Sequence, residues 1–437
     1  MDPLDPTYQT YKNFRFTKFF PLPELQSDLI ELIHEPTGAR IMHIANEDPE
    51  NLFCLAFQTL PTRSNGVAHV LEHTVLCGSQ KFPIKDPFFS MSRRSLNTFM
   101  NALTGQDFTC YPASSLVEKD FYNLLEVYLD AVFSPQLKKL SFLQEGHRLE
   151  FSSVKDIESP LRYQGIVFNE MKGAMASADS RLWHHIMEHL VPDLPYHYNS
   201  GGDPKEIVNL TYGDLLDFHR IFYHPSRCLF FFYGNLELAK HLDFIEEMAL
   251  KNVKKLAPLP PIPLQKRFKT PIEKVNFFPI QSDEDLENQC QIAFCFLTAH
   301  LSWQSDILAL SLIEILLLDT DASPLKMALL QSGMCLEVDS LLDTEMSEIP
   351  FILICKGCNQ KNTQKLKKFI FKTITQFIAK PIDLILIEAA IQQLEFDRTE
   401  IHGGSDPYGL NLFFRSGLIK LHGIDPEEGL KIHTLFY

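Results

Sequence analysis

The sequence lacks any apolar segment long enough to cross a membrane, since a spanning helix needs about 20 predominantly apolar residues. The best candidate, residues 371–391, is interrupted by Lys372, Lys380, Pro381 and Asp383. The N-terminal stretch MDPLDPTYQTYKNFRF lacks the basic-then-apolar order of a secretory signal and the Arg-rich amphipathicity of a transit peptide. We therefore expect a cytoplasmic protein with no membrane partner, unless a presequence is removed before this numbering begins.

Positive charge is scarce as well. The 40 Lys and Arg residues face 55 Asp and Glu residues, which gives a formal net charge of −15. A nucleic-acid partner is not expected, because phosphate contacts require clustered Lys and Arg. The only glycine-rich candidate for a phosphate loop, NSGGDPKE (199–206), lacks the Lys-Ser/Thr pair that completes such a loop.

Cysteine is infrequent and irregularly placed. There are nine cysteines, an odd number, with no spacing typical of a disulfide framework, so we expect reduced thiols. The one C-x-x-C pair, Cys355 and Cys358, follows the apolar run PFILI and has no second pair to complete a zinc knuckle. We interpret these two residues as buried thiols at the end of a strand.

Apolar runs, turns and helical patterns alternate along the chain without a regular βαβ rhythm, which predicts an α+β fold. Residues 25–60 predict a meander of antiparallel strands, and SRCLFFFYGNL predicts a buried strand. The segment KKLAPLPPIPLQKRFKTP contains five prolines and predicts an extended linker. We expect a first α+β domain at 1–253, a linker at 254–274, and a second, related α+β domain at 275–437 that stops before it is complete.

Three predicted helices carry the residues of chemical interest. One spans NGVAHVLEHTVLCG, with Ser64 or Asn65 as its N-cap and Gly78 as its end. A second covers residues 85–105. A third begins at Ser159-Pro160 and continues without interruption through residue 190.

Two pentapeptides fit H-x-x-E-H, the inverted zinc-peptidase signature: HVLEH (69–73) and HIMEH (185–189). On a helix, residues four apart share one face, so His69 and His73 can direct both imidazoles at one metal ion. Glu72 lies on the flank of that face, where its carboxylate can take a proton from water. A hydrolytic zinc site needs a third protein ligand and an open fourth position.

A single catalytic zinc ion needs only one of the two motifs, and a chain with 16 histidines can contain the pattern by accident. The first motif is favoured because a helix flanked by strands holds a ligand pair rigidly. The second lies at the end of a long predicted helix, where histidines are favoured by the helix dipole. The residues alone leave the second motif as the less favoured candidate; the resemblance described next implies that it is accidental.

The residues around the first motif resemble the presequence-protease branch of the pitrilysin/insulinase (M16) metallopeptidases. The similarity covers most of residues 30–235 and is weaker afterwards. It is carried by GVAHVLEHTVLCGSQKFPIKDPFF, SLNTFMNALTGQDFTCYP, YLDAVFSPQL, QEGHRLE, GIVFNEMKGA, SGGDP and FYHPSRCLFFFYGN.

The resemblance implies a zinc metallo-endopeptidase with one zinc ion per chain, bound by His69, His73 and Glu170, and with Glu72 as general base. Glu170 is the glutamate of NEMKG. The wider family often places its third ligand nearer to the first motif, which would point to Glu150 instead. We favour Glu170 because the whole GIVFNEMKGA string matches.

The family binds its substrate backbone as an added strand near the string MNALT. The resemblance therefore implies Asn101 and Ala102 as substrate contacts, although an ordinary helix-to-strand corner would also account for them. The implied substrates are short unstructured peptides.

The family fold has four related α+β domains in two halves, which close around a chamber. This chain resembles the N-terminal half only. The C-terminal half, which supplies an Arg and a Tyr to the substrate carbonyl, would be its missing partner. We expect this chain to bind zinc and to cleave peptides weakly or not at all by itself.

Two other functions remain as alternatives. A non-catalytic homologue could act as a peptide-binding or assembly subunit, but such subunits usually lose metal ligands, and all four residues of the implied site are present. A thiol-redox protein using the C-x-x-C pair lacks the expected sequence context.

Overall fold

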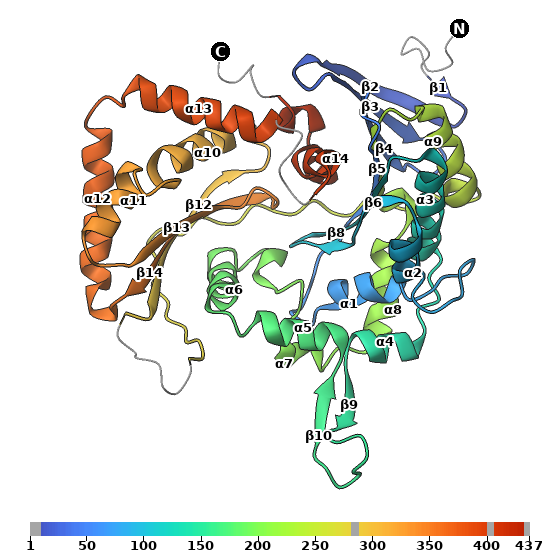
Figure 1. Ribbon diagram of the computed structural model, residues 1–437, viewed down its shortest axis with the longest axis horizontal. Coiled ribbons are helices and arrows are strands. Elements are labelled where there is room, and N and C mark those ends of the chain that lie inside the picture. Colours follow the sequence, from blue (N-terminus) through green and yellow to red (C-terminus); the bar gives the residue numbers. More distant parts are fainter. Residues whose placement is uncertain (1–9, 281–287, 400–405, 432–437) are drawn as a thin grey trace. The chain divides into compact units, whose positions relative to one another are not determined.

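The computed structural model describes residues 10–280, 288–399 and 406–431 (Figure 1). The chain divides into two compact units. Among the described residues, the first comprises 10–263 together with 406–430, and the second comprises 264–280, 288–399 and Lys431. The division falls inside the proline-rich segment, and residues 254–280 contain neither helix nor strand.

The first unit is built on a nine-stranded sheet in the order β1-β2-β3-β4-β11-β5-β8-β6, with β7 also paired to β8. Strand β11 is parallel to β4 and antiparallel to β5, and the other neighbouring strands are antiparallel. The strands are β1 (Thr10–Tyr11), β2 (Phe14–Leu22), β3 (Ser27–His34), β4 (Arg40–Ala45), β5 (Asn51–Gln58), β6 (Asn97–Met100), β7 (Leu103–Thr104), β8 (Phe108–Ser115) and β11 (Cys228–Gly234).

This pairing confirms the strands predicted within 25–60 but not a simple meander. Strands β3 and β4 are neighbours, whereas β11 lies between β4 and β5. The reason is the composition of β11, CLFFFYG, in which every residue is buried. A strand that is apolar on both faces belongs in the middle of a sheet whose two faces are both covered.

Both faces of this sheet are indeed covered. Along β5, Phe53, Leu55 and Phe57 belong to one apolar cluster, and the alternating Leu52 and Cys54 belong to another. The period of two follows from strand geometry, since successive side chains point to opposite faces. Figure 1 shows α3 and α9 on one side of the sheet and α14 on the other.

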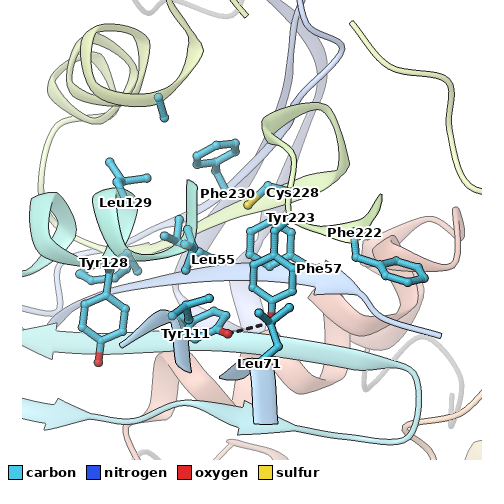
Figure 2. Packing of buried hydrophobic residues seen from close by; sticks show 14 of the residues in the cluster. Leu55, Phe57, Leu71, Tyr111, Tyr128, Leu129, Phe222, Tyr223, Cys228 and Phe230 are labelled. Carbon is cyan, nitrogen blue, oxygen red and sulfur yellow. Dashed lines mark hydrogen bonds between the residues drawn. The ribbon is translucent and has the colours of Figure 1, made fainter. Parts of the chain in front are cut away.

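Helices cover the first face. Helices that contribute several residues to its apolar cluster include α1 (Val67–Val75), α3 (Glu118–Phe133), α8 (Tyr212–Phe222) and α9 (Leu238–Ile245). Figure 2 shows the centre of this cluster, where Leu71 of α1 lies beside the aromatic rings of the sheet face. There Phe57 stacks on Tyr223 with ring centroids 4.6 Å apart, and the hydroxyls of Tyr111 and Tyr223 are 2.8 Å apart.

The remaining elements before the linker surround this core. They are α2 (Pro87–Arg94), α4 (Lys139–Glu145), α5 (Ile166–Ala174), α6 (Ala178–Leu190), α7 (Pro204–Ile207) and the hairpin of β9 (Arg148–Phe151) and β10 (Leu161–Gln164). The hairpin projects away from the sheet (Figure 1).

The opposite face is covered by a late segment of the chain, which contains α14 (Tyr408–Leu412) and α15 (Leu418–Leu421). Its Phe413 packs against Phe231 with ring centroids 5.4 Å apart. His422 Nε2 lies 3.1 Å from Asp107 Oδ2, and Asp107 is buried. The predicted boundary at 254–274 therefore misses that a segment after the linker belongs to the first unit. This segment is distant in sequence but covers an apolar face of the first sheet.

Two predicted helices also differ from the structure. The helix expected over 85–105 ends at Arg94 and is followed by β6 and β7. The helix expected from Ser159 to residue 190 is divided into β10, α5 and α6. At its first break, a Cβ on Gly165 would lie 1.9 Å from the carbonyl oxygen of Gly146, so this position requires glycine.

The second unit has a three-stranded antiparallel sheet in the order β12-β14-β13. Its elements are β12 (Cys290–His300), α10 (Gln304–Leu318), α11 (Pro324–Gln331), β13 (Glu337–Leu342), β14 (Glu348–Cys358), α12 (Thr363–Ile378) and α13 (Leu384–Thr399). Cys355 and Cys358 are buried free thiols at the end of β14, as predicted. The α+β fold class is confirmed. Among the described residues, no helix has both the length and the apolarity to cross a bilayer.

Candidate active site

Helix α1 presents the first motif on the edge of the apolar core. Its Val70 and Leu71 are fully buried in the cluster shown in Figure 2, which fixes the rotation of the helix. The same rotation brings His69 and His73 together, with ring centroids 5.0 Å apart. The helix begins at Val67 after Gly66, whose φ of 66° is left-handed, so the predicted caps Ser64 and Asn65 lie one or two positions too early.

Gly66 also permits a close approach of a second backbone segment. A Cβ at this position would lie 2.8 Å from the carbonyl oxygen of Gly201. That same carbonyl oxygen is 3.2 Å from Nδ1 of His69. When Nδ1 donates this hydrogen bond, Nε2 of His69 keeps its lone pair for a metal ion, as is usual for a ligating histidine.

His73 is oriented by a carboxylate instead. Its Nδ1 lies 3.2 Å from Oε2 of Glu145, and Gln144 Nε2 donates to Oε1 of the same carboxylate at 2.8 Å. Burial alone would lower the pKa of His73, but the hydrogen bond to Glu145 and the nearby carboxylates outweigh burial and raise it. Burial alone would raise the pKa of Glu145, and its hydrogen bonds from His73 and Gln144 lower it.

Replacing Glu145 with Gln should weaken zinc binding about 10- to 100-fold, the usual cost of losing such an orienting partner. The neutral amide cannot replace the charge-assisted hydrogen bond to His73. Competition with a chromophoric chelator measures the affinity, and Glu158→Gln, at an exposed hairpin position, is the matched control. Equal zinc affinity in the Glu145 and Glu158 variants would remove Glu145 from the site.

Glu170 reaches the two histidines from α5. Its Oε1 is 3.6 Å from His69 Nε2, and its Oε2 is 3.9 Å from His73 Nε2. The three residues each offer one donor atom, and these atoms all lie within 4.8 Å of one another. Glu150, the alternative third ligand, lies on β9, where it pairs with Arg148 Nε at 2.6 Å, and it is outside this group.

Glu72 stands beside the donor group without belonging to it. Its side chain is buried, with a relative exposure of 7%, and Thr104 Oγ1 of β7 donates to Oε2 at 2.5 Å. Burial raises the pKa of Glu72, although the hydrogen bond from Thr104 and the two histidines act in the opposite direction. A carboxylate with a raised pKa is a stronger base when ionised, which suits proton transfer.

Asn101 and Ala102 lie between β6 and β7 and are not members of the donor group. Both strands pair with β8, and within the described residues β6 ends the sheet order. Asn101 N donates to the carbonyl oxygen of Pro112 at 3.1 Å, which keeps the corner against the sheet. The segment is thus a sheet edge that is joined to the site through Thr104.

Three supporting residues were not singled out from the sequence: Glu145, Gly201 and Thr104. Each occurs inside a string that carried the family resemblance, namely QEGHRLE, SGGDP and MNALT. Only the resemblance could have pointed to these three residues. They lie on other segments than the first motif, so helical or strand periodicity does not relate them to it.

The second motif lies on α6, a helix separate from α5. Glu188 Oε2 is 3.7 Å from His185 Nδ1 and 3.8 Å from His189 Nδ1. These three residues form a second group of donor atoms within 4.8 Å of one another. Here the motif's own glutamate faces the histidines, whereas in the first motif the third donor comes from another helix.

The fold and the first donor group are those of an α+β protein with a candidate metal site. Helices packed on the core hold two imidazoles and one carboxylate close together. Two nitrogen donors and one oxygen donor suit a zinc ion, and three protein ligands are the number that catalytic zinc sites have. The orienting partners of both histidines also fit such a site.

Residues 61–176 match the family Insulinase (Peptidase family M16), and residues 209–394 match the Peptidase M16 inactive domain. The mitochondrial presequence protease of Xenopus laevis is 40% identical over 427 residues, covering 97% of this chain and 41% of that protein. The chloroplastic/mitochondrial presequence protease 1 of Arabidopsis thaliana is 38% identical, covering 94% of this chain and 38% of that protein.

A crystal structure of a protease from Helicobacter pylori has a TM-score of 0.65 at 17% identity, covering 91% of this chain and 93% of that one, and so shares the fold. The chain belongs to peptidase family M16. It spans about 41% of the length of the Xenopus relative that it matches.

The expectation of a cytoplasmic location is wrong. The presequence proteases that this chain resembles are named for mitochondria and chloroplasts. An organelle address is read by import receptors and leaves no mark on the composition or charge of the folded domains. The composition of this chain therefore carried no information about the compartment.

Proposed function

We propose that this chain is the zinc-binding part of a metallo-endopeptidase that hydrolyses short unstructured peptides in an organelle. The observation that carries the proposal is the convergence of His69, His73 and Glu170, with Glu72 buried beside them. Membership of family M16 supports the reaction class.

The proposed zinc ligands are His69, His73 and Glu170. A bound zinc ion supplies Lewis-acid chemistry, which polarises a peptide carbonyl and makes water more acidic. Glu72 accepts the proton of the attacking water and delivers it to the leaving amine. Thr104 holds the Glu72 carboxylate by its hydrogen bond at 2.5 Å, so that one oxygen remains available for the proton.

The proposed substrate site is the sheet edge at Asn101 and Ala102. A peptide added there as a strand would be recognised through its main chain, which is common to all sequences. Since β7 also carries Thr104, a strand on this edge would run close to Glu72. This supports a preference for extended peptides over folded proteins.

The rest of the longer protein is proposed as the partner of this chain, supplying groups that hold the substrate carbonyl. The alternative, a non-catalytic peptide-binding or assembly subunit, is disfavoured because the donor group and the buried base are both present. The proposed roles are a catalytic first unit, which includes residues 406–430, and a supporting second unit.

The 437-residue chain alone should bind zinc but cleave a quenched fluorescent peptide at least about 100-fold more slowly than the longer protein. Loss of a single group that stabilises an oxyanion costs about 10²- to 10³-fold. Zinc content and kcat/KM are measured on both proteins. Turnover by the chain alone that equals that of the longer protein would contradict the need for a second half.

The same assay applied to His69→Ala in the longer protein tests the choice of metal site. Zinc that survives gel filtration and peptide hydrolysis should both be lost. If both survive in this variant and are lost after His185→Ala, the proposed site is wrong.

A further inference from the structure

We infer that α6 carries a second site for a divalent transition-metal ion, formed by His185, Glu188 and His189. Among the residues that the structure describes, this is the one group besides His69, His73 and Glu170 whose metal-binding atoms gather within 4.8 Å. The inference does not rest on the proposed function, because it concerns binding by residues outside the proposed hydrolytic site. It revises the interpretation of HIMEH as accidental.

The helix itself brings the two imidazoles together. His185 and His189 are four residues apart within α6 (Ala178–Leu190), and their ring centroids are 4.5 Å apart. Residues at this spacing share one helix face. The pair is therefore positioned by local backbone structure and does not depend on long-range packing.

Glu188 adds the oxygen donor. Its Oε2 lies 3.7 Å from one ring nitrogen and 3.8 Å from the other, so the carboxylate faces both rings. Both distances exceed a hydrogen bond, and thus the carboxylate has not closed on either imidazole. A cation bound by one nitrogen of each ring would give this carboxylate a short ligand bond that neither ring now provides.

The backbone orients one of the rings. His189 Nδ1 lies 3.0 Å from the carbonyl oxygen of His185. When Nδ1 donates to this carbonyl, Nε2 keeps the lone pair that binds a metal ion. A backbone carbonyl is a usual orienting partner of ligating histidines, and Gly201 has the same relation to His69.

The chemistry of the donors selects the ion. Imidazole nitrogen suits Zn²⁺, Cu²⁺ and Ni²⁺, whereas Ca²⁺ and Mg²⁺ prefer oxygen ligands throughout. The Glu188 side chain is 62% exposed, so its carboxylate remains well hydrated without a metal ion. We therefore expect weaker binding than at the first site, whose histidines are each oriented by a partner from another element.

The second site binds a metal ion without hydrolysing peptides. In the first motif, Glu72 stays free of the donor group and Glu170 serves as the third donor. In the second, Glu188 is itself the third donor, so no separate carboxylate of the group is left to act as a base. Metal binding at this site would stabilise the helix, because an ion that joins His185 and His189 holds the last turn of α6 in its helical conformation.

The test is a calorimetric titration of Zn²⁺ into the full 437-residue chain carrying His69→Ala and His73→Ala, which removes the first site. One equivalent of Zn²⁺ should still bind. Adding His185→Ala, or separately His189→Ala, should weaken that binding by more than about tenfold, since even the loss of an orienting partner costs about 10- to 100-fold. Ca²⁺ should not bind.

His184→Ala is the matched control, because His184 is adjacent on the same helix and lies outside the group. It should leave the affinity unchanged. The inference is overturned if the double variant binds no Zn²⁺, or if His184→Ala weakens binding as much as His185→Ala. The second result would indicate scattered binding to surface histidines.

Two controls distinguish the loss of a metal ligand from misfolding of the variant. Far-ultraviolet circular dichroism compares each variant with the parent chain, and His189→Gln repeats the ligand removal with a polar side chain. In the unmutated chain the second equivalent should appear as a weaker phase after the first is filled. Absence of that phase overturns the inference, whereas a failure of the proposed function would leave the phase in place.

Discussion

Glu72→Gln in the longer protein should abolish peptide hydrolysis while zinc remains bound. Removing a general base costs about 10²- to 10⁴-fold. The amide has nearly the same shape as the carboxylate, and Thr104 still has an oxygen to which it can donate. The proposed ligands His69, His73 and Glu170 are unchanged. The measurements are kcat/KM with a quenched fluorescent peptide and zinc content by mass spectrometry.

Glu150→Gln is the control for this substitution, because Glu150 was the alternative third ligand and lies outside the donor group. It should leave both cleavage and zinc content unchanged. Undiminished cleavage by the Glu72 variant would exclude Glu72 as the base. Loss of zinc after Glu150→Gln would instead show that the third ligand had been misassigned.

Phe413→Ala should destabilise the first unit by about 3–5 kcal/mol, the range for a large aromatic side chain removed from a core. Phe413 is fully buried against Phe231, on the sheet face opposite the candidate site. Its removal leaves a cavity between the sheet and the segment 406–430. A loss of this size is a large fraction of the stability of a typical domain. Thermal unfolding followed by circular dichroism should show a midpoint lower by roughly 10 °C.

The same substitution at an exposed phenylalanine shows whether the loss of stability comes from the buried packing of Phe413 or from the removal of any phenylalanine side chain. Phe396 is 57% exposed, so Phe396→Ala should change stability by no more than about 0.5 kcal/mol. Equal midpoints for the two variants would mean that the late segment does not complete the core. A chain ending at residue 401 extends the test, since it would leave one face of the sheet uncovered and should aggregate.

The sequence was most informative where the structure is local. The helix around HVLEH follows from apolar spacing, and β11 follows from its uninterrupted apolar run. By contrast, the pairing of β11 between β4 and β5, and the return of residues 406–430 to the sheet, depend on packing between distant segments. No periodicity encodes which buried face a late helix will cover.

The predicted long helix before residue 190 failed for a related reason. Its apolar spacing is helical in parts, but Gly165 is required by contact with the distant backbone of Gly146. That break gives α5 its own direction and brings Glu170 to the two histidines. Only the family resemblance pointed to Glu170, because the pairing of a ligand with a motif so far away cannot be obtained from spacing.

The close approach of Gly66 and Gly201 has a consequence for folding during synthesis. The two histidines are translated early, yet Glu170 and the carbonyl that orients His69 follow much later in the chain. A ribosome-bound chain that stops before residue 201 would carry the HVLEH sequence without the carbonyl that orients His69. The donor group and its orienting carbonyl are thus brought together only after most of the first unit has been synthesised and folded.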